Sequence, residues 1–195
     1  MTGPRVRRGP DEARRVILEA AEELLLRGGV AAVQVRAVAA RAGMTDAGVN
    51  HHFGGRDGLL QALLRHGGRK LRAGVGELLD SWLDGPPDLA KLVETLAAFY
   101  RSGYGELAAA LHAAGWRDEG SGMLTPVVEA LHALRPDAAH VPVEDTRLAV
   151  AALHQALALD PLYGREFRRS AGLPDDASAQ LRWWTTHLTR ALGLG

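Results

Sequence analysis

Residues 35–53, VRAVAARAGMTDAGVNHHF, decide how the chain is expected to fold. Residues 35–42 have the composition of a short helix. Gly43 ends this helix, because glycine accepts the left-handed backbone of a tight turn at little cost. Thr45 then provides an N-cap for a second short helix over residues 45–52. Two short helices joined by such a turn predict a helix-turn-helix.

The residues of these two helices separate into a buried wedge and an exposed face. Six apolar residues are expected to lock the helices together: Val38, Ala39, Ala42, Met44, Val49 and Phe53. The outward positions are small or polar: Thr45, Asp46, Ala47, Gly48, Asn50 and His51. Such a face fits the DNA major groove, which admits a helix. Gly48 costs the helix about 1 kcal/mol relative to alanine, which suggests either the close approach of another surface or sequence drift.

The rest of the chain also has helical spacing, and no segment keeps the alternation of a strand. We therefore expect an all-α protein of about nine helices. Gly28-Gly29 is expected to end the first helix, and Asp160-Pro161 to interrupt or kink the eighth. The predicted helices cover residues 11–27, 35–42, 45–52, 57–83, 89–102, 105–116, 123–135, 143–159 and 176–192.

Composition excludes several classes of protein. The chain has 195 residues, 47% of them apolar, which is enough for a real core. It has no cysteine, which rules out disulfides, cysteine-bound zinc, iron–sulfur clusters and thiol catalysis. There is no run of eighteen apolar residues, and no apolar stretch follows the basic residues near Met1. We expect a soluble cytoplasmic protein without a membrane contact.

Charge is distributed unevenly along the chain. Residues 1–72 contain 13 basic and 7 acidic residues, and residues 73–195 contain 10 and 16. The basic part suggests an end that faces a polyanion, although chance variation of the surface is the alternative. The arm Arg5-Val6-Arg7-Arg8 either reaches into a minor groove or stays disordered in solvent.

Residues 14–64 resemble the N-terminal domain of the TetR family of transcriptional regulators. The resemblance lies in residues 17–21, 24–29, 35–39, 42–45 and, above all, 47–60 (AGVNHHFGGRDGLL). The last segment is similar to the family pattern hydrophobic-Tyr/Asn-Tyr/His-His-Phe-Gly-Ser-Lys-Glu-x-Leu-Leu. The chain departs from the common family residues at five positions: it has Gln34 for a Ser or Thr cap, Ala37 for an acid, Asn50 for the tyrosine that contacts phosphate in many members, His51 for an aromatic residue and Arg56 for lysine. Asparagine is also familiar at the position of Asn50.

The resemblance implies a DNA-binding domain with a basic arm over residues 1–55 and an effector-binding and dimerisation domain over residues 56–195. We expect Thr45, His51 and Arg56 to hold phosphates. Arg36, Asp46 and Asn50 should lie near base edges, with Ala47 and Gly48 on the same face. The alternative is that the arginines are merely solvated and that Asp46 only favours the start of a helix.

The middle helices supply apolar area with a few polar tips. This composition suits either a pocket for a small apolar or amphipathic effector or an ordinary core. The candidate effector-binding residues are Trp82, Phe99, Tyr100, Tyr104, His112, Trp116, Met123, His154 and Tyr163.

The last two predicted helices, residues 143–159 and 176–192, resemble a partner surface. Small residues such as Ala149, Ala152 and Ala156 let helices approach closely. Two helices from each of two subunits would make the four-helix interface of a homodimer. Burial within one chain is the alternative.

No catalytic or metal-binding pattern stands out. The rings of His51 and His52 point about 100° apart on a helix, so they do not easily share a metal ion. We therefore predict no enzyme activity, no cofactor and no metal. The predicted function is a ligand-responsive regulator, in the main case a repressor that an effector releases from its operator. The alternatives are a small helical ligand-binding protein or enzyme with a vestigial DNA-binding domain, and a regulator without a small-molecule effector.

Overall fold

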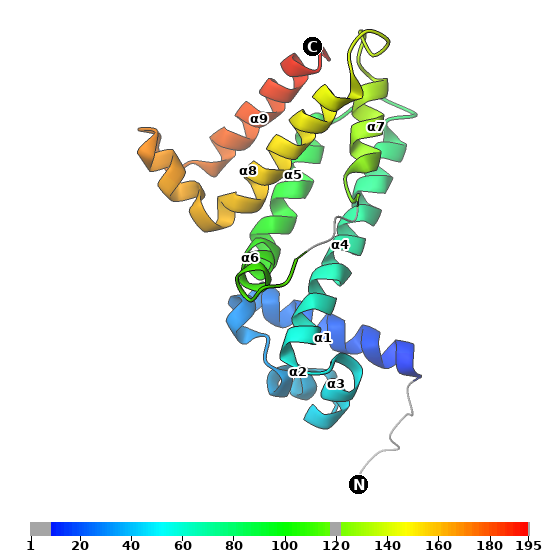
Figure 1. The fold of residues 1–195 in the computed structure, drawn as a ribbon, viewed down its shortest axis with the longest axis vertical. Coiled ribbons are helices and arrows are strands. Elements are labelled where there is room, and N and C mark those ends of the chain that lie inside the picture. Colours follow the sequence, from blue (N-terminus) through cyan, green and yellow to red (C-terminus); the bar gives the residue numbers. More distant parts are fainter. Residues whose placement is uncertain (1–8, 118–121, 195) are drawn as a thin grey trace. The chain divides into compact units, whose positions relative to one another are not determined.

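The computed structural model describes residues 9–117 and 122–194. Every regular element in these ranges is helical (Figure 1). The elements are α1 (Pro10–Ala32), α2 (Val35–Ala42), α3 (Asp46–Phe53), α4 (Arg56–Ser81), α5 (Leu89–Phe99), the π-helical segment η1 (Tyr100–Tyr104), α6 (Gly105–Ala113), α7 (Thr125–Ala133), α8 (Val143–Ser170) and α9 (Ala177–Ala191). Since α5, η1 and α6 follow one another without a break, these ranges contain eight separate helical runs. The all-α prediction is confirmed.

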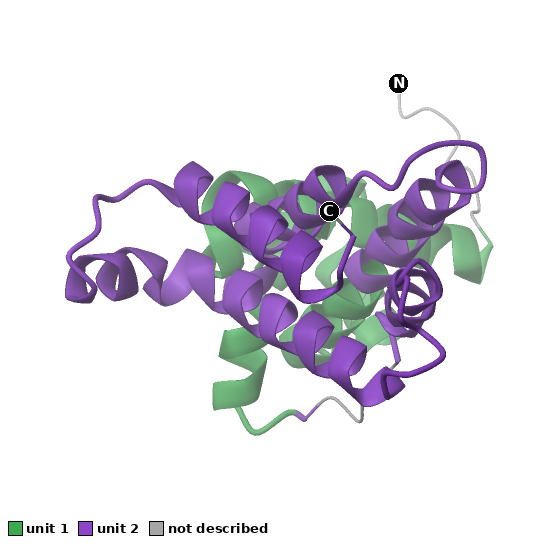
Figure 2. Ribbon diagram, turned by 90° about the horizontal axis from the view of Figure 1, so that it is seen from above, with its two compact units in different colours: residues 1–66, 107–116 green, residues 67–106, 117–195 purple. Residues whose placement is uncertain are grey.

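The chain forms two compact units (Figure 2). Unit 1 comprises Met1–His66 and Leu107–Trp116, and unit 2 comprises Gly67–Glu106 and Arg117–Gly195. The helix α4 therefore begins in unit 1 and ends in unit 2. The functional division that the sequence suggests, between residues 55 and 56, is a separate matter and stays a prediction.

The core of unit 1 joins α1, α2 and α3. Val38, Ala39, Ala42, Val49 and Phe53 are buried as predicted, and Met44 is half-buried. From α1 they are joined in the core by Ile17, Ala21 and Leu25. The regular part of α1 ends at Gly28-Gly29, where the backbone leaves helical geometry, as the sequence predicts.

The core of unit 2 is a leucine-rich cluster. α5 begins after Asp88, whose side chain accepts a hydrogen bond from the backbone N–H of Lys91 at 2.8 Å. Its buried residues Leu92 and Leu96 belong to the same cluster as Leu153 of α8 and Leu188 of α9. α8 and α9 lie side by side over α5 (Figure 1). Most of the leucines of these helices are therefore buried in the core of this chain.

α8 continues to Ser170, so the prediction that this helix ends at residue 159 was wrong. It changes direction along its course (Figure 1), and Pro161 lies inside it, so Asp160-Pro161 does not end the helix. Beyond the kink, the buried Arg168 donates to Asp160, to Gln180 Oε1 at 2.8 Å and to Asp175 Oδ1 at 2.9 Å. This network ties the last part of α8 to the start of α9.

Within the described ranges, no helix combines the length and apolar character that crossing a membrane requires.

Candidate nucleic-acid interface

The turn between α2 and α3 has the geometry that the sequence predicts. Gly43 adopts the left-handed conformation (φ 65°, ψ 36°), and the N–H of Met44 donates to the carbonyl of Ala39 at 2.9 Å. Thr45 then caps α3, because its Oγ1 accepts a hydrogen bond from the N–H of Gly48 at 3.1 Å. Both the glycine turn and the threonine cap are confirmed. They fix the start of α3 relative to the end of α2.

α3 turns one face inward and another to solvent. Val49 and Phe53 are buried in the wedge, whereas Asp46, Ala47, Asn50 and His51 are exposed. Arg36 of α2 and the capping Thr45 are exposed as well, and Gly48 is half-buried. The predicted base and phosphate contacts of these residues stay predictions. An exposed, capped helix with short side chains is the geometry that a major groove admits.

Gly48 is explained by its own neighbours. A Cβ atom at this position would lie 3.3 Å from Thr45 Oγ1 and 3.5 Å from the terminal methyl of Met44. The first distance is tighter than ordinary van der Waals contact, so a side chain would press on the hydroxyl that caps the helix. The close approach suggested by the sequence is therefore made by the cap itself.

Arg56, at the start of α4, is half-buried and bonded to the backbone of the α1–α2 connection. Its Nε donates to the carbonyl of Val33, and its Nη2 to the carbonyl of Val30, both at 2.9 Å. It is therefore not a simple solvated cation, which was the alternative left open by the sequence. Its predicted contact with phosphate stays a prediction.

Two further arginines join the helices of unit 1, and nothing next to them in the sequence indicates this role. Arg14 of α1 donates to the carbonyl of His52, and its guanidinium lies 4.6 Å from the centroid of the Phe53 ring. Arg41 of α2 pairs with Glu23 of α1, with Nε to Oε2 at 2.6 Å. Neither pairing leaves a signal in the sequence, because the partners meet only when the helices cross.

His52 is half-buried at the end of α3, and its environment favours the neutral ring. Burial lowers the pKa of His52 below its usual 6.5, and the nearby His51 and Arg14 lower it further. Its ring lies 5.5 Å from that of His51, edge to face. No group of three or more potential metal-ligating side chains occurs in the part of the chain that the structure describes. The arm Arg5-Val6-Arg7-Arg8 lies outside the described residues.

Four of the predicted effector residues come together in unit 2. Phe99 stacks on Tyr104 with ring centroids 4.5 Å apart, and it meets Tyr100 edge to face at 5.1 Å. The Tyr100 hydroxyl is hydrogen-bonded to Nε2 of His154. Burial raises the pKa of Tyr100 and lowers the pKa of His154, so both groups are neutral near pH 7. We call these four residues the aromatic cluster.

The other five predicted effector residues are placed differently. Trp82 is buried in the core of unit 2, and its indole N–H has no hydrogen-bond partner among the described residues. Met123 of unit 2 is half-buried. His112, which is exposed, and Trp116, which is half-buried, belong to unit 1. Tyr163 is 53% exposed, and its ring neighbour is Phe167, at 6.0 Å.

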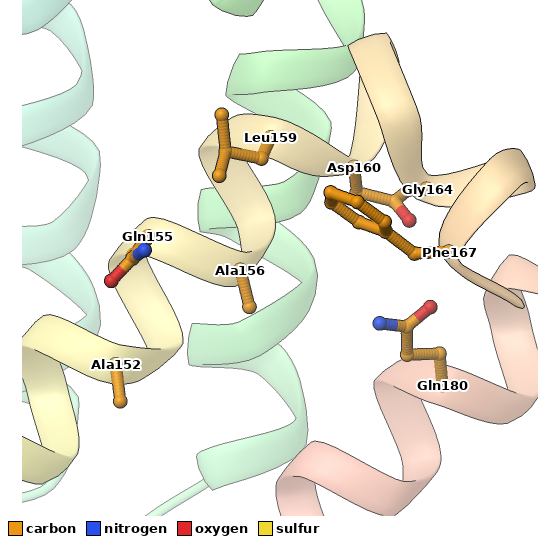
Figure 3. A pocket seen from close by; sticks show the side chains of 8 residues that line it. All are labelled: Ala152, Gln155, Ala156, Leu159, Asp160, Gly164, Phe167 and Gln180. Carbon is orange, nitrogen blue, oxygen red and sulfur yellow. The ribbon is translucent and has the colours of Figure 1, made fainter. Parts of the chain in front are cut away.

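α8 and α9 together expose large apolar side chains. Leu148, Phe167 and Trp183 are 69%, 57% and 56% exposed. Phe167 also lines a hollow of about 260 Å³ at the bend of α8 (Figure 3). It is lined by Ala152, Gln155, Ala156, Leu159, Asp160, Gly164, Phe167 and Gln180. We use the name α8–α9 face for the exposed Leu148, Phe167 and Trp183 together with the residues that line this hollow.

A capped helix that presents a short, polar face above an apolar wedge defines a helix-turn-helix protein. Residues 17–63 match the model of the bacterial regulatory proteins of the tetR family. The HTH-type transcriptional repressor Rv3405c of Mycobacterium tuberculosis is 31% identical over 139 residues, covering 56% of this chain and 74% of the relative. The chain belongs to the TetR family. It is a transcription regulator and not an enzyme, which decides against the alternative of an enzyme with a vestigial DNA-binding domain.

Solved structures agree with this assignment. The multidrug binding protein EbrR, crystallised with ethidium, is 26% identical with a TM-score of 0.54, and the match covers 92% of this chain and 98% of EbrR. The EbrR complex with imidazole gives 26% identity, a TM-score of 0.55, and coverage of 93% and 95%. The structure of BioQ, at 18% identity and a TM-score of 0.57, covers 93% of this chain and 98% of BioQ, and shares the fold.

Proposed function

We propose that the protein is a homodimeric repressor that binds operator DNA through α2 and α3 of each subunit and leaves it when a small molecule binds in unit 2. The observation that carries the proposal of DNA binding is the exposed face of α3, which has short, mainly polar side chains. The helix begins at Thr45, whose side chain caps it through a hydrogen bond. A regulator of this kind works in the cytoplasm.

The proposed contacts follow from the exposure and chemistry of each residue. Thr45, His51 and Arg56 bind phosphates. Arg36, Asp46 and Asn50 lie near base edges, where arginine pairs with guanine and asparagine with adenine. Ala47 and Gly48 complete the same face and allow close approach. Because Nε and one N–H of Nη2 of Arg56 already donate to carbonyls, its phosphate contact depends on Nη1 and on the second N–H of Nη2.

A homodimer through α8 and α9 would present two copies of α3 to one DNA duplex. The exposed Leu148, Phe167 and Trp183 support this interface, because large apolar side chains at a surface are buried when another protein covers them. The small residues Ala152 and Ala156 line the hollow and would let helices of a second subunit approach closely. The predicted interface within residues 143–159 and 176–192 extends in this proposal to Phe167.

Symmetry of the dimer sets the length of the operator. Two recognition helices enter successive major grooves when they lie roughly 34–36 Å apart, which is one turn of DNA. Selection from a random duplex library tests this directly. We expect enrichment of inverted repeats whose half-sites are about one turn apart, or slightly more. A library that shows no enrichment at low salt would contradict the operator proposal.

The effector is proposed to be small and apolar or amphipathic, and to bind at the aromatic cluster with Trp82 and Met123 of unit 2. We also propose His112, Trp116 and Tyr163 as effector-binding residues. The EbrR structures with ethidium and imidazole support a small-molecule role for this fold. α4 runs from unit 1 into unit 2, so a shift of this helix would carry the signal. By linkage, the effector weakens DNA binding by the same factor as DNA weakens effector binding.

Thermal shift of the protein alone tests the effector proposal, with ethidium as the first probe and a panel of apolar and cationic compounds beside it. DNA is left out because ethidium intercalates. A ligand of the native state raises the melting temperature. We expect Phe99→Ala to remove this rise and Leu83→Ala, a change of an exposed side chain outside the cluster, to keep it. If no compound raises the melting temperature, the chain is a regulator without a small-molecule effector.

A further inference from the structure

The first turns of α1 meet the last turn of α3. Arg14 donates from Nη1 to the carbonyl of His52, although the two residues lie 38 positions apart in the sequence. The last carbonyls of a helix have no partner inside it, and they form the negative end of its dipole. Arg14 therefore stabilises the C-terminal end of α3 in two ways: it donates a hydrogen bond to a free carbonyl, and it places a positive charge at the negative end of the dipole.

The same side chain also touches the wedge. The guanidinium of Arg14 lies over the ring of Phe53, 4.6 Å from its centroid, and Phe53 is buried. Arg14 thus contacts two consecutive residues, one through its backbone and one through its ring. The other end of α3 is fixed by the Thr45 cap. A rotation of α3 about its axis or against α1 would break both contacts of Arg14.

We propose that Arg14 is a positioning residue for DNA recognition, which holds the C-terminal end of α3 against α1 so that the exposed face keeps its angle, and which does not itself bind DNA. The inference rests on the proposed function in one respect, namely that the α3 face reads the operator. By residue type alone, an arginine in this basic unit would be assigned to phosphate. Its bonded geometry points to a partner inside the protein instead.

The neighbouring residue Arg15 provides a matched control. Its Nη1 pairs with Oε1 of Glu19 at 2.8 Å, one turn further along the same helix. Arg14→Ala and Arg15→Ala therefore remove the same charge from adjacent positions of α1. Only the first change removes a contact with α3. Any difference between the two variants is then due to the position of the contact and not to the net charge of unit 1.

DNA binding is measured with the full-length protein on two duplexes of equal length, the one selected from the random library and one unrelated. We expect Arg14→Ala to weaken the selected duplex about tenfold, because both subunits lose a charge-assisted bond and a ring contact. The unrelated duplex should change less than about twofold, and the salt dependence should stay the same. Arg15→Ala should change neither duplex by more than about twofold.

A phosphate contact would behave differently. It would weaken both duplexes alike and lower the salt slope by about one unit, and this result would overturn the proposal. Arg14→Lys keeps the charge but loses the planar group over Phe53, so we expect it to stay at least about threefold weaker than the parent protein. Full recovery in the lysine variant would also overturn the proposal, because geometry would then not matter.

His52 reports on the contact in the absence of DNA. Titration of its ring by NMR should give a higher pKa in Arg14→Ala, since a nearby positive charge has been removed, and the parent pKa in Arg15→Ala. The same samples show by circular dichroism that the variants fold. If the parent selects no duplex, the proposed function fails and the inference with it. If the parent selects one and Arg14→Ala binds it equally well, only the inference fails.

Discussion

The exposed faces of α3 and α9 belong to one chain but have opposite characters. On α3 the exposed side chains are short, as at Asp46, Ala47 and Asn50. On α9 the exposed Trp183 stacks on His187, with ring centroids 4.7 Å apart and planes at 8°. Short polar side chains allow the edges of bases to approach the helix. Burial of a large apolar surface against another protein lowers the free energy of the complex. The size of the exposed side chains thus distinguishes the proposed DNA-binding surface on α3 from the proposed dimer interface on α8 and α9.

The two faces are also held in shape by different means. α3 depends on bonds to its backbone, from Thr45 and Arg14. The α8–α9 face depends on the side-chain network of Arg168 with Asp160, Asp175 and Gln180. Substituting the residues of one set of interactions at a time tests whether each face depends on its own hydrogen bonds.

The largest effect is expected for Arg168→Ala, which leaves the largely buried Asp160 without its partner. We expect the free energy of unfolding to fall by about 3 kcal/mol, as is usual when one member of a buried ion pair is removed. Urea denaturation measures the change. The exposed neighbour Arg169 provides the control, since Arg169→Ala should stay within about 0.5 kcal/mol of the parent. Equal losses in both variants would contradict a specific role of the network.

The next effect concerns the proposed dimer interface. Trp183→Glu should weaken the homodimer about 30-fold, or about 2 kcal/mol, because tryptophans are frequent hot spots of interfaces. Sedimentation equilibrium over a range of concentrations measures the dissociation constant. Leu83, 84% exposed in the segment after α4, is the matched control. If Leu83→Glu weakens association as much, the α8–α9 face is not the interface.

A smaller effect is expected at the start of α3. Thr45→Ala removes the side-chain acceptor for the N–H of Gly48 and should cost about 1 kcal/mol of stability. Thermal unfolding of the full chain detects this loss. Thr45→Ser keeps a hydroxyl at the same place and should retain most of the stability. A serine variant as weak as the alanine variant would show that the cap is not the reason.

The smallest effect involves neither face and concerns the interior of unit 2. Because burial holds the pKa of His154 below 6.5, the unfolded chain binds more protons than the folded chain once the pH falls through that value. The free energy of unfolding therefore has its full contribution from His154 above about pH 6.5. It loses this contribution as the pH falls below that value. Denaturation at pH 7.5 and 5.5 should show a smaller decline in stability for His154→Leu than for the parent.

Tyr100→Phe separates burial from hydrogen bonding at His154. The variant removes the hydroxyl that bonds to His154 Nε2 but keeps the ring. Since burial is the cause of the lowered pKa, the decline between the two pH values should persist in this variant. Its disappearance would assign the pH dependence to the hydrogen bond.

Local chemistry predicted much of unit 1. The conformation of Gly43, the cap by Thr45 and the break at Gly28-Gly29 all follow from residues next to the feature that they form. The buried wedge follows from apolar spacing on two short helices. Such features depend on neighbours in the sequence, and so a single sequence contains the information to predict them.

Features that depend on how helices cross were not predictable in the same way. Arg56 meets the carbonyls of Val30 and Val33 only after α4 has packed beside the end of α1. α8 continues past Pro161, and Arg168 in its later turns donates to Asp175 and to Gln180 of α9. These partners meet only when the two helices pack together. Tyr163 follows the proline and is exposed, and its predicted part in effector binding stays a prediction.

The crowding at Gly48 has a consequence for how the operator preference of this protein could change over time. Substitutions at Asp46, Ala47 and Asn50 would alter the proposed DNA-binding face without crowding the Thr45 hydroxyl that caps the helix. A methyl group at position 48 would instead press on the Thr45 hydroxyl. A side chain there would therefore change the exposed face of α3 and the cap of the helix together. Adaptation to a new DNA sequence is therefore easier at the first three positions than at the fourth.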